Sequence, residues 1–543
     1  MTGENHSDLV RRARSHTLGD LLRRTSYRYP DKVAIVDGDL RMTFGQFDNA
    51  VDNCAAALAS RGLAKGDRLG LLSRNGWEFA ALAYAAARLG IVLVPINFML
   101  NSNEIAYILG HAEVAGMVAE EALIDVAQDA LVTAEISRAV KGIVRATSSP
   151  TSPPPPGWEH VSEWLSERVA PPPQPLLDDD DPLRLMYTSG TESRPKGVML
   201  TSRSLISQYV SCAIDGGMDH DDVDLHTLPL YHCAQLDCFL CVDIYLGATS
   251  VILPSPDPAA MLAAIEREAV TKLFCPPTVW IGLLRHPDFD HRDLRSLRKG
   301  YYGASAMPVE ILKELQERLP RVEFWNFYGQ TEMAPVATIL RPTEQATHPG
   351  SAGRASLNVE TRVVDDEDTI VDAGVIGEIV HRSPQATLGY YRDPDKTTDA
   401  FRNGWFHSGD LGVMSAEGYL SVVDRKKDMI KTGGENVASR EVEEALYELE
   451  GVAEVAVFGI HDPRWIEAVA AVIVARPGVS LTEDDVHRHA RERLAGYKRP
   501  KYVVLAQSLP KNPSGKILKR ELRQMHAELS GTARQPLQDS PQN

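Results

Sequence analysis

Long apolar runs are missing from this chain, and cysteine is scarce. No stretch of about 18 consecutive apolar residues occurs, which is the length that a transmembrane helix needs. Residues 1–20 carry basic side chains but no apolar segment, so they do not resemble a secretory signal. The 543 residues contain 6 cysteines, too few for a disulfide framework in so long a chain. These absences predict a cytoplasmic protein with no integral membrane segment.

Basic residues are outnumbered by acidic ones. The chain has 57 lysines and arginines against 74 aspartates and glutamates, which gives a formal net charge of -17. This balance argues against nucleic acid as a partner and against a surface for anionic membranes. An anionic substrate must therefore be met by local cations. The hydrophobic fraction of 43% is typical of a globular protein, and the length predicts two or more domains.

Half of the cysteines lie close together in the sequence. Cys233, Cys238 and Cys241 follow His232, a grouping that could suggest metal ligands. Their spacing lacks the Cys-x2-Cys pairs of zinc sites, and residues 236–246 are apolar and aromatic. We therefore expect buried thiols rather than a metal site.

Short β-rich runs alternate with longer helical patterns along the first half of the chain. This alternation predicts an α/β fold with largely parallel sheets. Strands are expected at 33–36, 68–72, 91–94 and 249–253, and helices at 47–61, 78–90 and 259–269.

Composition marks the domain boundaries. Pro-rich segments at 147–156 and 171–182 predict a surface excursion around a short helix at 158–168. A strand at 418–423 precedes the charged run 424–428, and a compact α/β pattern then continues to about residue 522. We interpret the chain as a large N-terminal domain of mixed parallel sheets and helices, a small mobile α/β lid domain and a disordered polar tail. Their expected limits are 1–426, 427–525 and 526–543.

Residues 185–198 concentrate hydroxyls, glycines and cations between two apolar runs. The hydroxyls can donate to phosphate oxygens, and the glycines let backbone N–H groups face an anion. The order of lysine and glycine is reversed relative to a P-loop, so this is not a Walker A motif. We predict a phosphate-binding loop. Its candidate ligands are Thr188, Ser189, Gly190, Thr191 and Lys196.

Further motifs follow in order along nearly the whole chain. Together they resemble an acyl-CoA synthetase (fatty-acid–CoA ligase) of the adenylate-forming superfamily, which also contains adenylation domains and firefly luciferase. The matching segments are 187–198, 228–232, 302–305, 328–332, 404–410, 424–430, 433–437 and 510–516.

The resemblance implies a two-step reaction. A carboxylic acid and ATP form an acyl adenylate, and the acyl group then passes to the thiol of coenzyme A. Lys516 would bridge the carboxylate and the α-phosphate, and Thr331 would also touch that phosphate. Glu332 would hold Mg2+. His232 would border the acyl pocket.

The resemblance also assigns the nucleotide site and the path of the thiol. Tyr328 would lie against adenine, and Asp410 and Arg425 would bind the ribose. The lid would rotate about a hinge at Lys427, relative to residues 1–426, the AMP-binding and acyl-binding domain. The remaining expected contacts are Gly303, Ala304, Ser305 and Gly329 for the nucleotide, and Gly433 and Gly434 for the pantetheine arm.

The phosphate loop departs from the family pattern, because Glu192 and Ser193 stand where threonine and glycine are usual. No basic residue marks a second substrate carboxylate, so we expect a small-molecule monocarboxylic acid that is fatty or otherwise hydrophobic. An acyl-AMP ligase that passes the acyl group to a carrier protein is an alternative, as is a relative that activates nitrite for diazo formation on an aryl amine. A non-catalytic ATP-binding scaffold is a third alternative, and a homodimer is left open.

Overall fold

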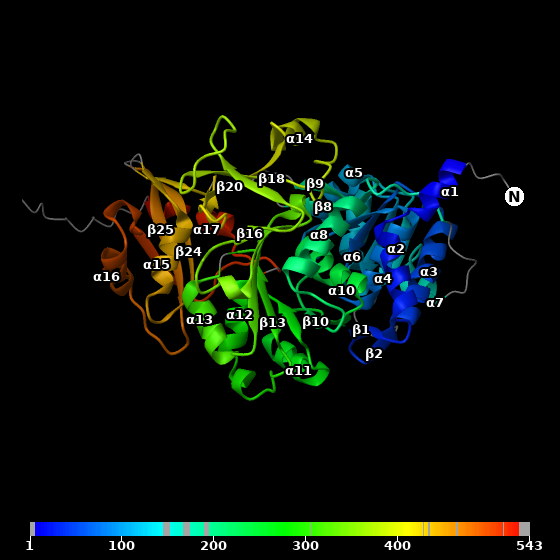
Figure 1. Ribbon diagram of the computed structural model, residues 1–543, viewed down its shortest axis with the longest axis horizontal. Coiled ribbons are helices and arrows are strands. Elements are labelled where there is room, and N and C mark those ends of the chain that lie inside the picture. The colour runs from blue at the N-terminus through cyan, green and yellow to red at the C-terminus, as the bar shows by residue number, and fades with distance from the viewer. Residues whose placement is uncertain are drawn as a thin grey trace, which may run out of the picture.

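The computed structural model describes residues 6–144, 153–166, 174–188, 195–305, 307–426, 428–432, 435–462, 465–513 and 515–530. Four β-sheets organise these residues (Figure 1). Within these ranges, no helix combines the length and the apolarity that a membrane crossing requires.

The first sheet has seven strands, and its strands are parallel except for the last pair. The terminal β8–β9 hairpin places Thr188 opposite Lys196, at the two ends of the predicted phosphate loop. In spatial order the strands are β7 (Glu159–His160), β6 (Val140–Val144), β5 (Gly116–Glu120), β3 (Arg68–Leu72), β4 (Val92–Pro95), β8 (Pro182–Thr188) and β9 (Lys196–Thr201).

The second sheet has nine strands with a parallel centre from β14 to β1. The carboxyl ends of its central strands meet at one edge, where ligands usually bind in α/β sheets. In spatial order the strands are β16 (Arg354–Ala355), β15 (Val336–Leu340), β14 (Glu323–Gly329), β13 (Lys299–Gly303), β12 (Lys272–Phe274), β10 (Val223–His226), β11 (Thr249–Ile252), β1 (Val33–Asp37) and β2 (Leu40–Thr43).

A third sheet is entirely antiparallel, which the alternation of strands and helices did not predict. It places Asp410 directly opposite Arg425 on neighbouring strands. Its strands are β17 (Glu360–Val364), β18 (Ile376–Arg382), β20 (Trp405–Met414) and β19 (Phe401–Arg402), with β21 (Leu420–Arg425) paired to β20.

The fourth sheet belongs to the C-terminal part of the chain and carries an apolar cluster on each face. Figure 1 shows it at the end of the molecule opposite the N-terminal helices. These features confirm the predicted α/β fold with a large N-terminal and a smaller C-terminal domain. The strands are β23 (Glu435–Val437), β22 (Ile430–Thr432), β25 (Ile466–Ala475) and β24 (Val452–Asp462), with β26 (Tyr502–Ala506) paired to β25.

The principal helices cover these sheets. Among them α4 is buried on nearly every side, since its sequence is apolar all round. The helices are α1 (His6–Ala13), α2 (Leu18–Arg28), α3 (Phe44–Ser60), α4 (Trp77–Leu89), α5 (Ser102–Ala112), α6 (Ile124–Thr133), α7 (Val161–Ser166), α8 (Ser202–Asp215), α9 (Cys233–Gln235), α10 (Cys241–Leu246), α11 (Pro258–Glu268), α12 (Pro277–Arg285), α13 (Val309–Arg318), α14 (Pro394–Ala400), α15 (Ser439–Tyr447), α16 (Glu483–Arg493) and α17 (Lys519–Met525).

The predicted strands and helices are present, with shifted ends. Helix α3 begins at Phe44 rather than at residue 47, because Thr43 and Gln46 form a capping box. The helix predicted at 158–168 is shorter, since β7 occupies its first residues. Within the predicted disordered tail, the short 3-10 helix η7 (Ala527–Ser530) is formed, and its Leu529 packs on the C-terminal core. Residues 531–543 lie outside the described part of the chain.

A charge cluster is buried beneath the edge of the second sheet. Lys272 pairs with Asp243 and lies 3.3 Å from Asp224 Oδ2, while His226 Nε2 lies 3.0 Å from Asp243 Oδ2. All four side chains are fully buried. Burial raises the pKa of Asp224 to about 7. The Lys272 ammonium is therefore the cation that makes this acidic cluster tolerable inside the protein.

Lys272→Met should lower the free energy of unfolding by about 3–5 kcal/mol, because it leaves a buried carboxylate without its cation. Lys498→Met is the matched control, since Lys498 pairs with Glu441 near the surface, and it should cost less than about 1 kcal/mol. Urea unfolding midpoints measure both effects. Equal shifts in the two variants would contradict a stabilising role for Lys272.

Candidate active site

Tyr328, Asp410 and Arg425 form one side of the site. The Tyr328 hydroxyl donates to Asp410 Oδ2 at 2.7 Å, and Arg425 Nε lies 3.1 Å from Asp410 Oδ1. Burial, followed by the Asp410 carboxylate, raises the pKa of Tyr328 well above its usual value, so the hydroxyl remains a donor. Strand β14 supplies the tyrosine, and the paired strands β20 and β21 supply the other two residues. Two sheets therefore combine to hold one carboxylate.

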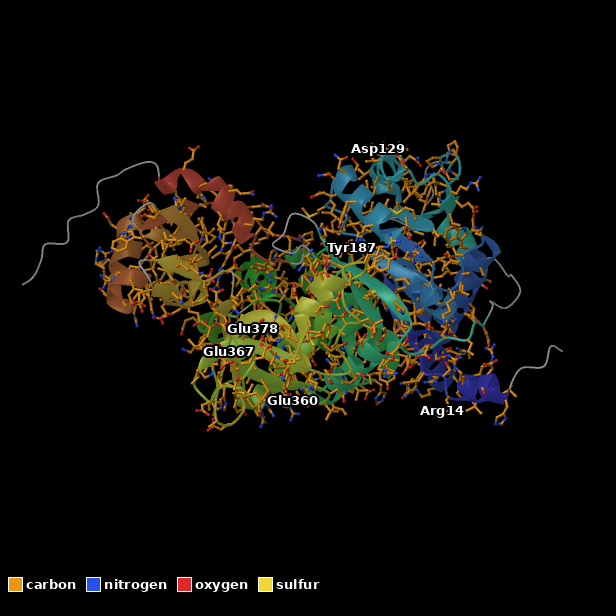
Figure 2. The ribbon with its side chains drawn as sticks, turned by 90° about the horizontal axis from the view of Figure 1, so that it is seen from above. Arg14, Asp129, Tyr187, Glu360, Glu367 and Glu378 are labelled. Carbon is orange, nitrogen blue, oxygen red and sulfur yellow. The ribbon has the colours of Figure 1, made fainter. Side chains whose placement is uncertain are left out.

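The backbone around Asp410 is also held in place. The amide of Asp410 donates to Ser408 Oγ at 3.1 Å, and Ser408 Oγ donates to the Ile379 carbonyl at 2.6 Å. The amide of Gly409 donates to Glu378, which Figure 2 labels. Asp410 is 5% exposed, and its Oδ1, although ion-paired with Arg425, accepts no well-aligned hydrogen bond from the described residues. This acceptor fits a sugar hydroxyl, as expected for a nucleotide ribose.

Glu332 lies in the turn η4 (Thr331–Met333), directly after β14. Its Oε1 accepts a hydrogen bond of 3.0 Å from Tyr390, and Lys196 Nζ lies 5.1 Å from the centre of the Tyr390 ring. The end of the phosphate-loop hairpin therefore comes close to Glu332. A partly exposed carboxylate is a suitable oxygen ligand for Mg2+. Tyr390 was not predicted, because no spacing in the sequence connects it to Glu332.

Close backbone contacts shape the carboxyl ends of β13 and β14. A Cβ on Gly303 would lie 2.4 Å from the Phe327 carbonyl oxygen, and one on Gly329 would lie 2.0 Å from that of Pro335. Ala304 adopts a left-handed backbone with a φ of 63°. Non-glycine residues in this region store strain, often at functional sites. Ala304 and Ser305 are exposed, so the predicted nucleotide segment is accessible.

His232 precedes α9, and its Nδ1 accepts a hydrogen bond of 3.2 Å from the Ala234 amide. Burial and the nearby Lys516 ammonium lower the pKa of His232 to about 4. The ring is therefore neutral at pH 7, with its proton on Nε2. Cys233 Sγ lies 3.3 Å from Thr331 Oγ1. The segment after His232 therefore lies against the η4 turn, and the Lys516 ammonium is close enough to His232 to act on its charge.

Lys516 reaches this place on a loop from the C-terminal part of the chain. The Lys516 amide donates to Asn512 Oδ1, and the Asn512 amide donates to the Lys516 carbonyl. Gly515 has a φ of +80°, and its carbonyl accepts a hydrogen bond of 2.8 Å from Thr278 Oγ1. A Cβ on Gly515 would lie 2.6 Å from Thr278 Oγ1. The loop therefore docks closely against the first turn of α12.

Several predicted site residues lie outside the described part of the chain. They are Ser189, Gly190 and Thr191, with their neighbours Glu192 and Ser193, and also Lys427, Gly433 and Gly434. The described cysteines are all buried and free, as expected.

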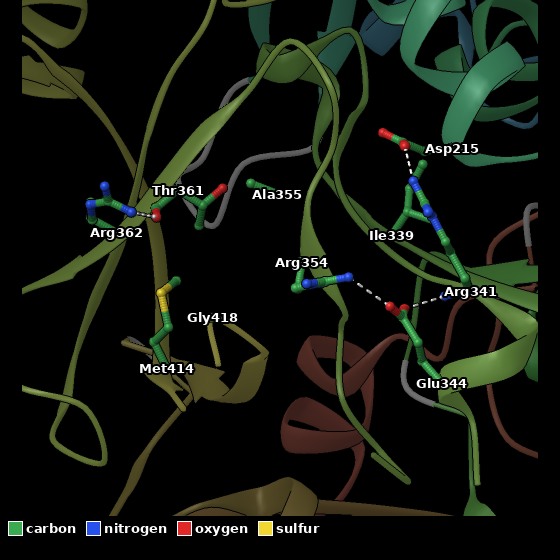
Figure 3. Close-up of a pocket in the computed structure, with 10 residues that line it drawn as sticks. All are labelled: Asp215, Ile339, Arg341, Glu344, Arg354, Ala355, Thr361, Arg362, Met414 and Gly418. Carbon is green, nitrogen blue, oxygen red and sulfur yellow. Dashed lines mark hydrogen bonds and ion pairs between the residues drawn. The ribbon is translucent and has the colours of Figure 1, made fainter. Parts of the chain in front are cut away.

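A separate cavity of about 300 Å³ contains none of the predicted site residues (Figure 3). Its three arginines already have acidic partners, since Arg341 pairs with Asp215, Arg354 lies 3.0 Å from Glu344 Oε1 and Arg362 lies 3.1 Å from Glu360 Oε1. These pairs leave the cavity without a surplus of unpaired charge to attract a phosphate.

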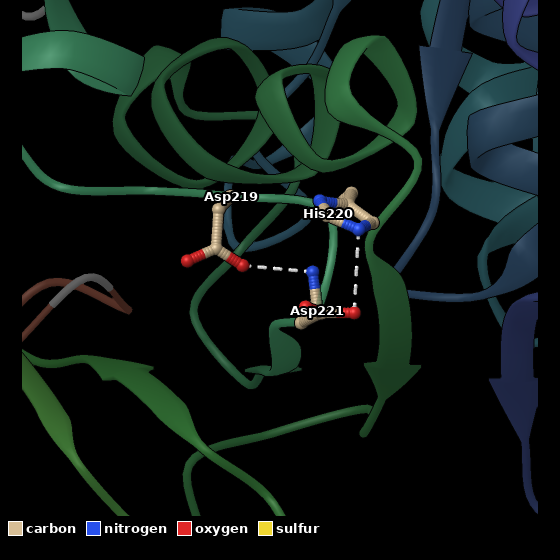
Figure 4. Close-up of side chains that lie close together, drawn as sticks. All are labelled: Asp219, His220 and Asp221. Atoms are coloured by element: carbon tan, nitrogen blue, oxygen red, sulfur yellow. Dashed lines mark hydrogen bonds and ion pairs between the residues drawn. The ribbon is translucent and has the colours of Figure 1, made fainter.

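The exposed group Asp219, His220 and Asp221 also lies apart from the site (Figure 4). Asp219 Oδ1 accepts the Asp221 amide at 2.8 Å, and its Oδ2 pairs with Lys299 at 3.0 Å. These contacts are those of a surface turn.

Comparisons with known proteins agree with this geometry. The family model described as "AMP-binding enzyme" matches residues 22–391, and that of its C-terminal domain matches residues 441–516. The chain is 33% identical to a feruloyl-CoA synthase from an Amycolatopsis species, over 94% of this chain and 99% of the relative. It is 34% identical to the long-chain-fatty-acid–CoA ligase FadD13 from Mycobacterium tuberculosis, over 94% and 98%.

Among solved structures, the anthranilate CoA ligase AuaEII in complex with anthranoyl-AMP has a TM-score of 0.86 at 27% identity. The similarity covers 95% of this chain and 98% of that protein. The three named proteins carry different acids in their names, so their likeness does not define one substrate.

Gly515→Ala should release the Lys516 loop from α12, because the new methyl group would collide with Thr278. Hydrogen–deuterium exchange at residues 511–518 should become faster. Gly478→Ala is the matched control, since Gly478 has a φ of +79° but no atom within 4 Å of the added Cβ. It carries the same left-handed backbone strain, roughly 1–2 kcal/mol, without the collision. Unchanged exchange in Gly515→Ala would contradict the docking.

Proposed function

Because this chain belongs to the AMP-binding enzyme family and is an AMP-forming acid–thiol ligase, we propose that its substrate is a fatty or otherwise hydrophobic monocarboxylic acid. Ligases of this family use ATP, Mg2+ and coenzyme A. The observation that carries the proposal is the electrostatic effect of the Lys516 ammonium on His232, whose neighbours Leu230 and Cys233 belong to a buried apolar cluster. The single Lys516 ammonium can neutralise one substrate carboxylate. The apolar residues beside His232 favour a hydrophobic acyl group, because a second charged group buried there would lack a partner.

We assign the first half-reaction to the residues around Lys516. A carboxylate oxygen of the acid forms a bond to the α-phosphorus of ATP, and the bond from that phosphorus to the bridging oxygen breaks to release pyrophosphate. Lys516 reduces the repulsion between the two anions and aligns them. Because His232 is neutral, it adds no second positive charge near the Lys516 ammonium. Bound Mg2+ neutralises the phosphates, and Glu332 is the residue that would hold it.

The nucleotide is positioned by residues of three other segments. Asp410 and Arg425 would hold the ribose, and Tyr328 would lie along the base while its hydroxyl fixes Asp410. Lys196 would approach the phosphates from the β8–β9 hairpin. These contacts would fix the α-phosphate relative to Lys516.

In the second half-reaction the coenzyme A sulfur attacks the carbonyl carbon, AMP leaves, and the thiol proton passes to solvent. Lys516 is not needed at the phosphate once pyrophosphate has formed. We assign to the segment 427–525 the role of a lid that pivots at Lys427 and opens a path lined by Gly433 and Gly434. The separate fourth sheet and its own apolar clusters support movement of this segment as one body.

The test is pyrophosphate release with ATP and Mg2+ across hydrophobic, aryl and dicarboxylic acids, each with and without coenzyme A. Hydrophobic monocarboxylic acids should support release and yield an acyl-CoA. Lys516→Ala should slow adenylation by about 10²–10³-fold, because charge stabilisation of the transferring phosphoryl group is lost.

Lys519→Ala is the control for that variant, because Lys519 lies three residues on and pairs with Glu443 at 2.8 Å. It should adenylate at close to the wild-type rate. A preference for dicarboxylic acids would contradict the proposed substrate class, and normal adenylation by Lys516→Ala would contradict the role of Lys516.

Tyr328→Phe should weaken ATP binding by about 5–10-fold, which corresponds to the roughly 1 kcal/mol of a lost hydrogen bond to Asp410. Direct titration of ATP into the protein measures the effect without turnover. Tyr419→Phe is the matched control, because the Tyr419 hydroxyl also donates to a carboxylate, that of Glu344 at 3.0 Å. Equal affinities in the two variants would show that the Tyr328 hydroxyl does not order the ribose site.

A further inference from the structure

An aromatic cluster fills the space between the segment after His232 and the second sheet. Phe239 lies in the π-helical turn η2 (Leu236–Leu240), a distortion that is common at functional sites. Its ring stacks on Phe274 with centroids 4.5 Å apart and meets Tyr301 edge-on at 5.3 Å. It also lies parallel to Phe327 at 5.9 Å. The four rings are 0–6% exposed.

The strand register places these rings in layers beneath the site. Gly303 and Phe327 are paired at the carboxyl edge of the sheet. Phe274 and Tyr301 are paired two residues deeper, and Lys272 and Lys299 form the next layer. Successive layers on one face of a parallel sheet are about 7 Å apart.

Gly303 ends β13 at the carboxyl edge of the sheet, and its Cβ position is closed by the Phe327 carbonyl oxygen at 2.4 Å. It lies on the same face of β13 as Tyr301, because side chains alternate along a strand. Tyr302 points to the opposite face, where its hydroxyl donates to Gln345 at 2.7 Å, and so it does not form a wall of this space as Tyr301 does. An acyl chain that passes His232 and Gly303 would therefore meet the rings of Tyr301 and Phe239 after about 7 Å.

The aromatic cluster is held in place from both sides. The Tyr301 hydroxyl donates to the Gly216 carbonyl at 2.7 Å, and the ring stacks on Trp325 at 5.1 Å. Behind Phe239, Lys272 Nζ lies 6.0 Å from the centre of its ring. Lys272 belongs to the buried charge cluster with Asp243 and Asp224. An alkyl chain that displaced Phe239 would therefore press against buried charges, which is unfavourable.

We propose that Phe239 limits the size of the acyl group, so that this enzyme activates compact hydrophobic acids and excludes long-chain fatty acids. The inference rests on the proposed function and narrows its substrate class. Phe239 is a specificity-determining residue here, since its ring separates the acyl space from the charge cluster and takes no part in the chemistry.

The experiment compares kcat/KM for pyrophosphate release with butanoate, hexanoate and benzoate against decanoate and hexadecanoate. The wild-type enzyme should favour the compact acids. Phe239→Ala should raise the ratio of kcat/KM for decanoate to kcat/KM for butanoate by about tenfold or more. Each additional methylene group that a hydrophobic pocket can bind raises kcat/KM for the longer acid by about tenfold or more. Phe239→Leu, a smaller perturbation of the core, should shift the ratio in the same direction.

Phe324→Leu is the control, because Phe324 is buried on the other face of the same sheet, edge-on to Trp280 at 5.6 Å. It should leave the decanoate-to-butanoate ratio unchanged. Thermal unfolding of each variant shows whether the fold is retained. If Phe239→Ala does not fold, Phe239→Leu is compared with Phe324→Leu instead.

The outcomes separate the two proposals. Efficient turnover of hexadecanoate by the wild type, or no change of the ratio in either Phe239 variant beyond that in Phe324→Leu, overturns the size limit and leaves the proposed function standing. Wild-type turnover of only dicarboxylic acids, or of no acid, overturns the proposed function and the size limit together.

Discussion

The position of Lys516 depends on a contact between distant parts of the chain, the hydrogen bond from Thr278 to the Gly515 carbonyl. His232, Thr331, Glu332 and Asp410 all come from the N-terminal part, whereas Lys516 comes from beyond the third sheet. Docking of Gly515 on α12 therefore completes the charge arrangement. A hydrogen bond of this kind has a net worth of about 1 kcal/mol. Such a contact can hold Lys516 in place and still be broken within a catalytic cycle.

Electrostatics explain why an acidic protein can receive a nucleotide. The net charge of -17 gives no general attraction for phosphate. Each cation near the site has a defined neighbour instead. Arg425 pairs with Asp410, Lys196 lies over Tyr390, and Lys516 acts on His232. These cations lie where phosphate and carboxylate would meet, although the chain as a whole is acidic.

Much of the fold and of the candidate site could be predicted from the sequence. Strand β3 and the helices α4 and α11 were expected within a residue or two, because their periodicity is strong and glycine, proline or aspartate marks their ends. Only the last strand of the third sheet was expected, at 418–423, since its other strands are joined by irregular loops and the short helix α14. Tyr390 and Phe239 were not recognised as neighbours of the site. Their importance depends on contacts with Glu332 and Tyr301, which lie more than 50 residues away in the chain.

The sequence by itself determined the chemical character of this protein. Hydroxyls, glycines and cations in ordered motifs identify its family and its reaction, because those residue types at those spacings suit phosphate, ribose and carboxylate. The tertiary structure decided which side chains meet. It brought the charge of Lys516 within reach of His232, set Tyr328 against Asp410, and placed Phe239 over the Lys272 ammonium of a buried charge cluster. Motifs act through neighbours in sequence, whereas the size of a pocket depends on the packing of strands and helices that only the folded chain brings together.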